Sequence, residues 1–556
     1  MKHKTDLVRT YGVSAMMLVL GTALGMNPDP ALAQDAPSSD AWERVRAVEP
    51  DSLTYQSFAK ASDALDRAIE VHGGGTIEEA YTDIAMSFLG SGVRTASQRF
   101  VGESVEYSVR GAVGFSKLFD ALSFIEEITV GEQSFRGYTI VSRDQILRIP
   151  TGEELPEPEP DIETEEHTVR MIFPYYWLGR ARDARESLRW LGEYEISGST
   201  LHAISFADAD GGATLLLDPE SGVLRRVELL TTHFVQGDAT GWIEFDGYED
   251  LAGHQFPTVR RERSVEGRFI REAQISFDGI RAETILPANI FSVPPQFRFA
   301  APDWTVTENP IAVETPTLPW NQVAPGLYWV DLADVANTQV LVIEHEHGCT
   351  VFNSPLTDQL AGEVLRSIEK NLPGKPVERI VCATFHPRFA GGLRTYLAAG
   401  AKIVTTPANE EYIRKILETP TRLVPDAPEV TLADGDIVLV DGEMTFGDGD
   451  DQLLVYDIGE KSAYTESYLV GWLPETRILL TSDLFAVLDS GRVRGASDRT
   501  QGLALWIAEA GVEPLQLIPT SPVNDHKRIM LIEDLEDSLQ ATTTGFTEIG
   551  PPMPGQ

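Results

Sequence analysis

One histidine and one carboxylate follow apolar runs, in positions where their side chains could do chemistry. His386 comes shortly after the apolar run 380–383 and before Gly391-Gly392, and Asp483 comes shortly after the run 478–481. Imidazole and carboxylate groups both bind divalent metal ions. A catalytic zinc ion takes about three such protein ligands and keeps one open position. The two residues could therefore belong to a metal centre if further ligands lie near them.

The residues around His386 form a recognisable stretch. Positions 380–394 read Ile-Val-Cys-Ala-Thr-Phe-His-Pro-Arg-Phe-Ala-Gly-Gly-Leu-Arg. This stretch resembles the strand–loop–helix motif of the metallo-β-lactamase fold superfamily, in which the strand ends in His-x-His-x-Asp-His and Gly-Gly follows at a helix start. Segments 398–404, 472–485 and 517–519 resemble later motifs of the same family in the expected order. The resemblance covers about residues 326–534 and implies an αβ/βα sandwich there.

The resemblance also assigns positions to the family's metal ligands. Aligned on Gly391-Gly392, these positions hold Thr384, His386, Arg388, Phe389, Tyr464, Asp483 and Ser521. Only His386 and Asp483 are of a ligand type. A guanidinium at Arg388 stays protonated and repels a dication. Without a metal, nothing lowers the pKa of a water molecule to about 7, so the hydroxide nucleophile of the family would be lost. The resemblance thus implies a degenerate site with no cofactor. The sequence does not decide whether the protein is an enzyme, but it favours a protein without enzymatic activity.

A positive charge at this site needs a partner. We expect Arg388 to take over the charge of the missing metal by pairing with Asp483, because pairing neutralises an otherwise costly buried carboxylate.

Two alternatives retain a metal ion. In the first, one zinc or other divalent ion binds His386 and Asp483 in a hydrolase with a remodelled mononuclear site, and Thr384, Tyr464 and Ser521 are polar helpers. In the second, a shifted site recruits the two histidines of residues 345–347, which share one strand face. In the resembled fold, however, that turn lies at the far end from the metals. We therefore expect residues 345–347 to form an exposed polar turn.

The N-terminal half has a different pattern, with short alternating runs separated by turn signals from about residue 84 to 299. Runs 214–217 and 223–230 flank Asp218-Pro-Glu-Ser-Gly222, which predicts strand, turn and strand. A helix pattern over 58–71 precedes them and ends at His72-Gly73, a glycine-capped helix end. We predict a large antiparallel sheet of the half-barrel type.

These features carry a fainter resemblance to the half-barrel lipoprotein-carrier domains of the periplasm. The opening helix ends in His-Gly-Gly, an Asp-Pro-x-Ser-Gly hairpin follows, and residues 253–258 read Gly-His-Gln-Phe-Pro-Thr late in the domain. Such domains wrap a curved sheet over a helix around an apolar cavity. The resemblance implies that an acyl chain or another apolar ligand could bind there; a closed structural β-domain is the alternative.

The C-terminal half alternates strand and helix patterns. Strands are predicted at 340–343 and 350–352 around a turn, at 380–384, 402–405 and 478–481, and in a hairpin of 453–458 with 468–473. Helices are predicted at 360–368, 392–399 and 409–418. This order predicts an α/β fold with mixed sheets.

Charge and cysteine content narrow the choice of partners. The chain of 556 residues has 45 Lys and Arg against 85 Asp and Glu, a formal net charge of −40. A nucleic acid is therefore not expected as a partner, because phosphate binding needs clustered cations. The two cysteines, Cys349 and Cys382, each lie in a strand pattern, which favours two buried thiols over a disulfide. The ligand, whether a small molecule, a lipid or a protein, is not specified by the sequence.

The first residues have the pattern of a secretory signal. Lys2 and Lys4 precede the short apolar run 13–24, and Ala31-Leu32-Ala33 fits signal peptidase cleavage after Ala33. No later run is long and apolar enough to span a membrane. We expect a periplasmic or secreted protein.

Together these patterns predict an α+β or α/β chain. The segments are a signal peptide at 1–33, a loose polar segment at 34–57, a β-rich half-barrel at 58–299, a linker at 300–325, a metallo-β-lactamase-like domain at 326–540 and a frayed tail at 541–556. The favoured function is a non-catalytic binding or scaffolding relative of metallo-hydrolases. The alternatives are the mononuclear hydrolase and a carrier of lipid or another apolar ligand.

Overall fold

The computed structural model describes residues 52–543, apart from 96–102, 132, 143–144, 151–168, 210, 234, 236, 267–268, 288–290, 292–317, 425–426, 464, 492 and 494. The chain divides into two compact units, Met1–Ala59 and Lys60–Gln556. The predicted signal peptide, most of the predicted linker and most of the C-terminal tail lie outside the described residues. Export of the chain therefore stays a prediction.

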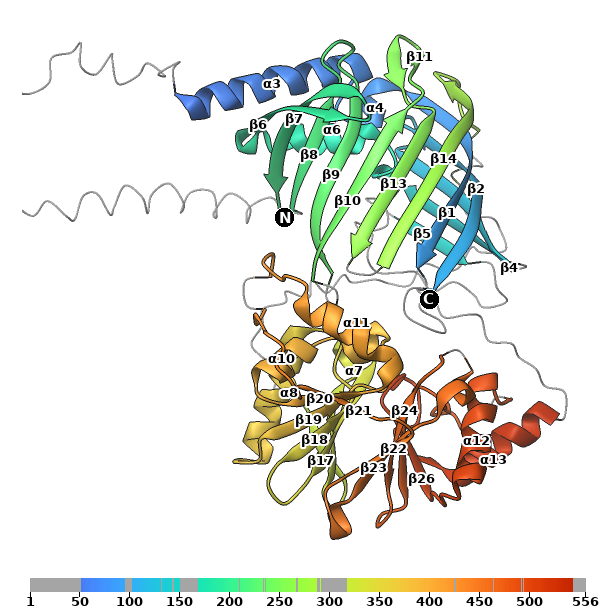
Figure 1. The fold of residues 1–556 in the computed structure, drawn as a ribbon. Coiled ribbons are helices and arrows are strands. Elements are labelled where there is room, and N and C mark those ends of the chain that lie inside the picture. The colour runs from blue at the N-terminus through green and yellow to red at the C-terminus, as the bar shows by residue number, and fades with distance from the viewer. Residues whose placement is uncertain are drawn as a thin grey trace, which may run out of the picture. The chain divides into compact units, whose positions relative to one another are not determined.

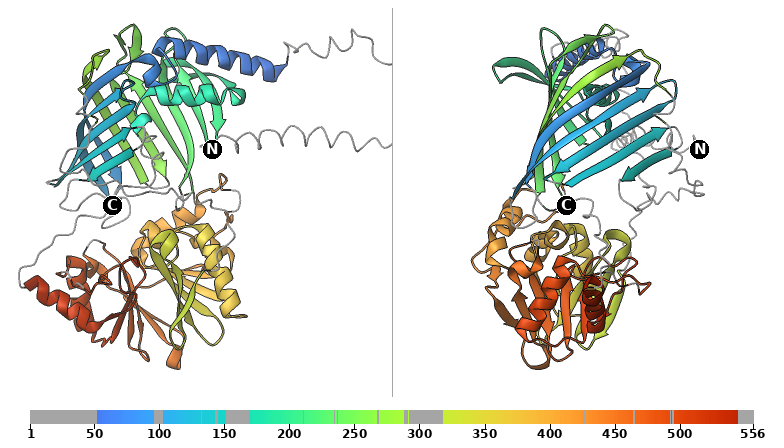
Figure 2. Two further views of the ribbon diagram at one scale, coloured as in Figure 1. Left: turned by 180° about the vertical axis from the view of Figure 1, so that it is seen from behind. Right: turned by 90° about the vertical axis from the view of Figure 1, so that its right-hand side faces the viewer.

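A 12-stranded antiparallel sheet forms the N-terminal half of the described chain, which confirms the predicted sheet. Its spatial order is β5-β4-β3-β2-β1-β14-β13-β10-β9-β8-β7-β6, and Figures 1 and 2 show it strongly curved. The strands are β1 (Asp83–Thr95), β2 (Ser104–Ser116), β3 (Ala121–Val130), β4 (Gln133–Ser142), β5 (Gln145–Pro150), β6 (Arg189–Ile196), β7 (Ser199–Asp208), β8 (Gly211–Leu217), β9 (Leu224–His233), β10 (Gly237–Asp246), β13 (Val259–Glu266) and β14 (Phe269–Ala282). A small hairpin of β11 (Glu249–Leu251) and β12 (His254–Phe256) lies beside it.

One face of this sheet is apolar because side chains alternate along each strand. On β14, Phe277 is buried and Ile275 half-buried, whereas Gln274 and Ser276 between and beside them are exposed. The apolar face packs on helices α4 (Ile77–Ala80) and α6 (Pro174–Asp183), together with the residues just before α6. We call this the inner face.

Helix α3 (Leu53–His72) ends where the sequence predicted, at His72 and Gly73. Gly73 has φ +82°, and the amide of Gly74 donates to the carbonyl of Ile69, which closes the last turn. The helix begins at Leu53, however, inside the segment 34–57 that was expected to be loose. Leu53 is 83% exposed and Tyr55 is 43% exposed, so no buried stripe marks this first turn.

The His72 side chain is fully buried, and its Nδ1–H donates to the Ala68 carbonyl at 2.8 Å. Burial lowers the pKa of His72 to about 4, although the hydrogen bond to Ala68 opposes this shift. The unfolded chain takes up this proton near pH 6.5 and the folded chain only near pH 4. The stability gained by keeping the ring neutral is therefore complete above pH 6.5 and is lost as the pH falls to about 4.

The lowered pKa of His72 predicts how the free energy of unfolding changes with pH. Between pH 7 and pH 4, the wild-type chain should lose about 2–3 kcal/mol more unfolding free energy than the variant His72→Phe, whose ring does not titrate. Urea titrations at the two pH values measure the difference. An equal loss in both chains would show that His72 does not titrate in this range.

Two sheets pack face to face in the C-terminal half (Figure 1). The first is mixed and has the order of its strands in the chain: β15 (Trp320–Ala324), β16 (Leu327–Leu332), β17 (Thr338–Glu344), β18 (Cys349–Phe352), β19 (Val377–Val381), β20 (Lys402–Thr405) and β21 (Ile437–Leu439). The second contains β22 (Glu443–Phe446), β23 (Leu453–Asp457), β24 (Leu469–Leu473), β25 (Ile478–Ser482), β26 (Gln516–Pro519) and β27 (Met530–Leu531).

Alternate side chains of β17 point into two different hydrophobic cores. Leu341 and Ile343 belong to the core between the two sheets, with residues such as Val455 and Leu480 of the second sheet. Val340 and Val342 point the other way, into the core under α8 (Asp358–Asn371), α10 (Leu393–Ala398) and α11 (Pro407–Glu418). Helices α12 (Asp498–Ala510) and α13 (Ile532–Thr543) pack against the second sheet, so the layers form the αβ/βα sandwich that was predicted.

Most of the predicted C-terminal elements match. The hairpin of β23 and β24 pairs Asp457 with Leu469, and β17 and β18 are antiparallel around the predicted turn. Residues 320–324, which were assigned to the linker, form β15 instead and pair with β16. Helix α13 continues to Thr543, into the expected tail.

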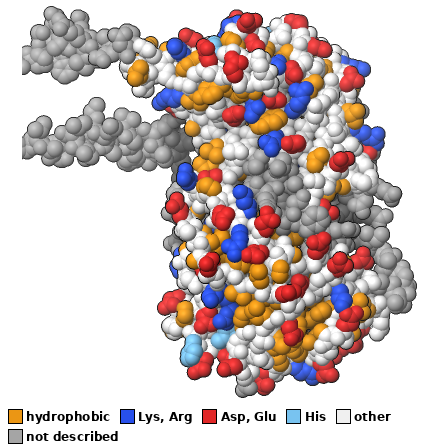
Figure 3. All heavy atoms as spheres, in the orientation of Figure 1, with side chains coloured by type: hydrophobic (Ala, Val, Ile, Leu, Met, Phe, Trp, Pro, Cys, Tyr) orange, Lys and Arg blue, Asp and Glu red, His pale blue; other side chains and the backbone are white. Residues whose placement is uncertain are grey.

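Among the described residues, no helix combines the length and the apolar character needed to cross a membrane. On the face drawn in Figure 3, acidic, basic and hydrophobic side chains are interspersed, so the net charge of −40 is not gathered into one patch on that face.

Candidate functional site

Four of the predicted site residues lie in loops that follow the carboxyl ends of strands in both C-terminal sheets. Thr384 and His386 follow β19, Asp483 follows β25, and Ser521 follows β26. Because β25 and β26 are parallel, their following loops leave the second sheet at one edge. In open α/β sheets, this edge is where ligands usually bind.

A buried polar network ties these loops together. Asn353, which follows β18, has φ +64° and donates from Nδ2 to Ser482 Oγ at 2.7 Å and to Thr520 Oγ1 at 2.9 Å. Its Oδ1 accepts from the amide of Ala383 at 3.1 Å. One side chain therefore links the ends of β18, β19, β25 and β26, and holds the site loops in fixed relative positions.

Asp483 is held by two side chains at once. Arg499 donates from Nη2 to Oδ1 at 2.8 Å and from Nη1 to Oδ2 at 3.1 Å, a bidentate ion pair. The Tyr468 hydroxyl also donates to Oδ1, and the guanidinium lies 5.3 Å from the centre of the Tyr468 ring. The side chains of Arg499 and Asp483 are only 17% and 18% exposed. Both carboxylate oxygens are therefore already engaged.

Asp483, Arg499 and Tyr468 affect one another's protonation. Burial opposes ionisation of Asp483, but the charge and hydrogen bonds of Arg499, with the Tyr468 hydroxyl, outweigh it and hold the pKa of Asp483 below its usual range. Burial and the nearby Asp483 charge raise the pKa of Tyr468 well above 10. At neutral pH the cluster is a carboxylate, a guanidinium and a neutral phenol.

His386 is half-buried beside this cluster. Its Nδ1 accepts the backbone N–H of Arg388 at 3.2 Å, which assigns the ring proton to Nε2. Burial lowers the pKa of His386; the Asp483 charge opposes this, and the charges of Arg388 and Arg499 add to it. The imidazole is thus neutral at pH 7 and offers one N–H donor.

The prediction that Arg388 pairs with Asp483 is wrong. Arg388 lies on the short helix α9 (Pro387–Ala390), and its Nη1 donates to Ser521 Oγ at 2.5 Å. The guanidinium on Asp483 belongs to Arg499, which enters from the first turn of α12. Arg388 therefore contacts the position of the family's last ligand, Ser521, rather than the bridging carboxylate.

The remaining ligand positions add few metal donors. Phe389 is buried, and Thr384 is buried with no hydrogen-bond partner for its hydroxyl. Tyr464 lies outside the described residues. The described part of the chain contains no group of three or more His, Cys, Asp or Glu side chains that could hold a metal ion.

The donor set therefore does not fit the zinc ion that the resembled fold implies. A zinc site needs about three nitrogen, sulfur or carboxylate ligands. Here the neutral His386 is the one imidazole, and a metal on Asp483 would have to displace Arg499 and Tyr468. The guanidiniums of Arg388 and Arg499 stay protonated and would repel a dication.

The shifted site at residues 345–347 is not assembled either. His345 is buried, not exposed as predicted, because its ring inserts between Thr350 Oγ1 at 2.8 Å and the Asp451 carbonyl at 3.0 Å. His347 is 81% exposed. Cys349 and Cys382 are buried, unbonded thiols, as expected.

Sequence reasoning missed Arg499 and Tyr468. A weak signal existed for Arg499: it stands in the first turn of α12, where the helix dipole disfavours a cation, so a specific anionic partner could have been suspected. Tyr468 directly precedes β24 and carries no such signal.

A second candidate site is a cavity of about 490 Å³ on the inner face of the 12-stranded sheet. Its apolar lining includes the stacked rings of Phe88 and Phe124, whose centroids are 5.5 Å apart, together with Phe277. Its polar lining includes Arg260, Glu262 and Arg271. A mainly apolar hollow with a few polar groups is typical of small-molecule sites.

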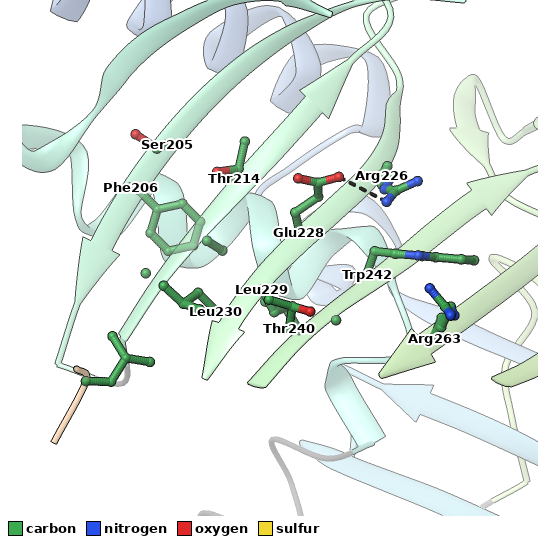
Figure 4. Close-up of a pocket in the computed structure, with 14 residues that line it drawn as sticks. Ser205, Phe206, Thr214, Arg226, Glu228, Leu229, Leu230, Thr240, Trp242 and Arg263 are labelled. Carbon is green, nitrogen blue, oxygen red and sulfur yellow. Dashed lines mark ion pairs between the residues drawn. The ribbon is translucent and has the colours of Figure 1, made fainter. Parts of the chain in front are cut away.

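A further hollow, drawn in Figure 4, contains the outward side chains of β9, β10 and β13. Its arginines form ion pairs: Arg226 pairs with Glu228 at 3.0 Å and lies 4.7 Å from the Trp242 ring centre, and Arg263 pairs with Glu272 at 2.8 Å. The Nε of Arg226 has no hydrogen-bond partner. Each arginine of this hollow already has a carboxylate partner, and we assign no function to it.

The C-terminal sandwich is similar to solved structures of metallo-β-lactamases and a sulfatase. The metallo-β-lactamase DIM-1 is 18% identical, with 41% of this chain and 98% of its own covered, at a TM-score of 0.31. FIM-1 from Pseudomonas aeruginosa, in its mono-zinc form, is 17% identical, with 41% and 96% covered, at 0.30. The sec-alkylsulfatase Pisa1 from Pseudomonas sp. is 16% identical, with 40% and 41% covered, at 0.28.

No protein-family model and no curated protein matches the chain. Similarity at these TM-scores does not by itself support a conclusion about fold or function. The sandwich itself, with two sheets packed between helices and site loops at the strand ends, has the architecture that the resemblance to the metallo-β-lactamase fold predicted.

Proposed function

We propose that the C-terminal domain is a metal-independent binding or scaffolding relative of the metallo-hydrolases. The observation that supports this most directly is the bidentate ion pair of Arg499 with Asp483, which is completed by the Tyr468 hydroxyl. The guanidinium supplies the positive charge that a metal would otherwise bring to this carboxylate. Asp483 then needs no metal to be stable in its buried position.

Neighbouring contacts support the same proposal. Arg388 is fixed by Ser521, and His386 has its Nδ1 engaged by the backbone. These contacts place neutral or cationic donors around the ligand positions rather than metal-binding lone pairs. Such a site favours binding of a polar or anionic group over activation of a water molecule.

Elemental analysis tests the proposal. After incubation with excess zinc, manganese or iron and removal of free metal, the purified full chain should retain less than about 0.1 ion per chain, because too few ligands are available. The variants His386→Ala and Asp483→Asn should give the same result. His347→Ala, which removes an exposed imidazole, is the matched control.

The mononuclear hydrolase with His386 and Asp483 as ligands is the outcome that would overturn the proposal. It requires one tightly held ion per chain, lost in both variants but retained in the His347→Ala control. Hydrolysis of a chromogenic ester that follows the ion content would support this hydrolase, for which the sequence assigns Thr384, Tyr464 and Ser521 as polar helpers.

The inner-face cavity supports a second function, binding of an apolar ligand by the N-terminal domain. The rings of Phe88, Phe124 and Phe277 line it, and so do Val169, Met171 and Ile172. Burial of an apolar chain there would gain about 25 cal/mol for each Å² removed from water. Co-purified lipid, identified by mass spectrometry, is the direct test, and a cavity free of any apolar ligand in repeated preparations would argue against this function.

A further inference from the structure

We propose that the inner-face cavity binds a long-chain carboxylate, with its chain against Phe88, Phe124 and Phe277 and its head at Arg260. This inference deepens the proposed apolar-ligand function and rests on it. The cavity, of about 490 Å³, has an aromatic side and a cationic side, which is the polarity of an anionic amphiphile.

Arg260 is the group that points to an anion. Its side chain is 8% exposed, lines the cavity, and stands directly between the buried Phe245 on β10 and Ile275 on β14. Its Nη2 donates to Glu262 Oε2 at 2.5 Å, but its Nε has no hydrogen-bond partner. An unpartnered donor on a buried charge is costly, and a ligand oxygen would satisfy it.

The guanidiniums around Arg260 are crowded together and share carboxylates. Arg94 stands directly opposite Arg271 on neighbouring strands, and like charges in that position repel each other. Glu262 is 3.4 Å from Arg271 as well as close to Arg260, so one carboxylate is shared by two guanidiniums. Among the described residues that line the cavity, the inward charged side chains are Arg260 and Arg271 on one hand and Glu262 and Glu126 on the other.

The cationic cluster stabilises its own carboxylate. Burial opposes ionisation of Glu262, but the charges of Arg260 and Arg271 outweigh it and lower the pKa of Glu262. Glu262 is therefore ionised at neutral pH and is shared between two guanidiniums, while the Nε of Arg260 still has no hydrogen-bond partner.

The apolar side of the cavity has the shape for a chain. Gly111 on β2 lies under the Phe88 ring, since a Cβ there would meet Phe88 Cζ at 2.4 Å. The absence of a side chain at Gly111 leaves room for the Phe88 ring, which stacks on Phe124. Val109 and Ile243 line the same cavity. Arg271, at 58% exposed, marks the solvent side, where a charged head could enter.

Displacement of the neutral dye Nile red from the full chain tests the inference. Oleate should displace the dye at a concentration about 10-fold or more below that of oleyl alcohol, because a hydrogen bond to a charged group contributes enough for a tenfold change or more. In Arg260→Gln, oleate should lose about 10-fold or more, and oleyl alcohol less than about 3-fold.

Matched variants separate charge from folding. Arg110→Gln removes an outward arginine that pairs with Glu127 and is 67% exposed, and it should bind oleate as wild type does. Arg260→Lys keeps a positive charge, and it should bind oleate more tightly than Arg260→Gln does. If Arg260→Gln fails to fold by circular dichroism, the oleate and alcohol comparison in the wild-type chain still decides.

The remaining outcomes distinguish failure of the carboxylate site from failure of the apolar-ligand function. Equal displacement by oleate and oleyl alcohol would leave the apolar-ligand function standing but overturn the carboxylate site. Displacement by neither would overturn both. Competition by inorganic phosphate at the concentration where oleate acts would show an anion site without a chain, and would also overturn this inference.

Discussion

Replacing Arg499 by methionine is expected to lower the free energy of unfolding by about 3–5 kcal/mol at pH 7, because removal of one partner leaves a largely buried charge uncompensated. Asp483 would keep only the Tyr468 hydroxyl. Methionine preserves much of the side-chain volume, so lost packing contributes little. Urea titration followed by far-UV circular dichroism measures the change.

The pH dependence of this loss provides an internal check. The ion pair with Arg499 lowers the pKa of Asp483 in the folded chain. The stabilisation by this ion pair is therefore present above the pKa that Asp483 has in the unfolded chain, and it is lost as the pH falls through the pKa of Asp483 in the folded chain. The difference between wild type and Arg499→Met should therefore shrink below about pH 4. A difference that stays constant down to pH 3 would point to packing instead.

An exposed ion pair serves as the control. Arg477 pairs with Glu513 at 3.3 Å, and their side chains are 43% and 83% exposed. Arg477→Met should change the free energy of unfolding by less than about 1 kcal/mol, since such pairs are screened by water. A loss below 1 kcal/mol in Arg499→Met would contradict the role assigned to this ion pair.

The fold could be predicted where burial leaves a periodic pattern. In the run 340–343, Val340 and Val342 face helices, while Leu341 and Ile343 face the second sheet, so both faces are apolar and the strand reads as fully buried. Strand β15 was missed for the opposite reason: Asn321 and Gln322 are both exposed, and the pattern does not alternate. An edge strand without a buried face resembles a loop in sequence.

The candidate site was only partly predictable. His386, Asp483 and Ser521 follow strands, and strand order alone places such residues at sheet ends. The partner of Asp483 could not be inferred in this way, because Arg388 and Arg499 both lie within reach of the site along different elements. Which guanidinium reaches the carboxylate depends on the positions of α9 and α12, and tertiary packing sets these positions.

His345 illustrates the same limit. Its turn is polar in sequence, and His347 is indeed exposed, but the ring of His345 is covered by Asp451, which is distant in the chain. A polar residue beside a turn is expected to face water unless a distant segment supplies its hydrogen bonds. Only the tertiary structure shows that such a segment is present.

The Gly391-Gly392 pair, on which the motif was aligned, has a steric reason that can be tested. A Cβ at Gly391 would lie 1.8 Å from the backbone oxygen of Leu356, and the Gly391 carbonyl accepts from Ser354 Oγ. Backbone cannot rotate away as a side chain can, so the loop after β18 would have to move. Since this loop begins at Asn353, the residue that links the site loops, the disturbance should spread to the whole site.

Gly391→Ala should therefore lower the free energy of unfolding by about 3 kcal/mol or more, which is the range of severe steric substitutions. Gly362→Ala in α8 is the matched control, because its Cβ would meet nothing closer than the Arg366 guanidinium at 3.7 Å. Alanine in a helix interior should raise stability there by about 0.5–1 kcal/mol. Opposite signs for two identical substitutions, measured in one set of urea titrations, would attribute the loss to the close approach at Gly391 rather than to the added methyl group. A loss of less than 1 kcal/mol at Gly391 would mean that this close approach is absent from the protein in solution.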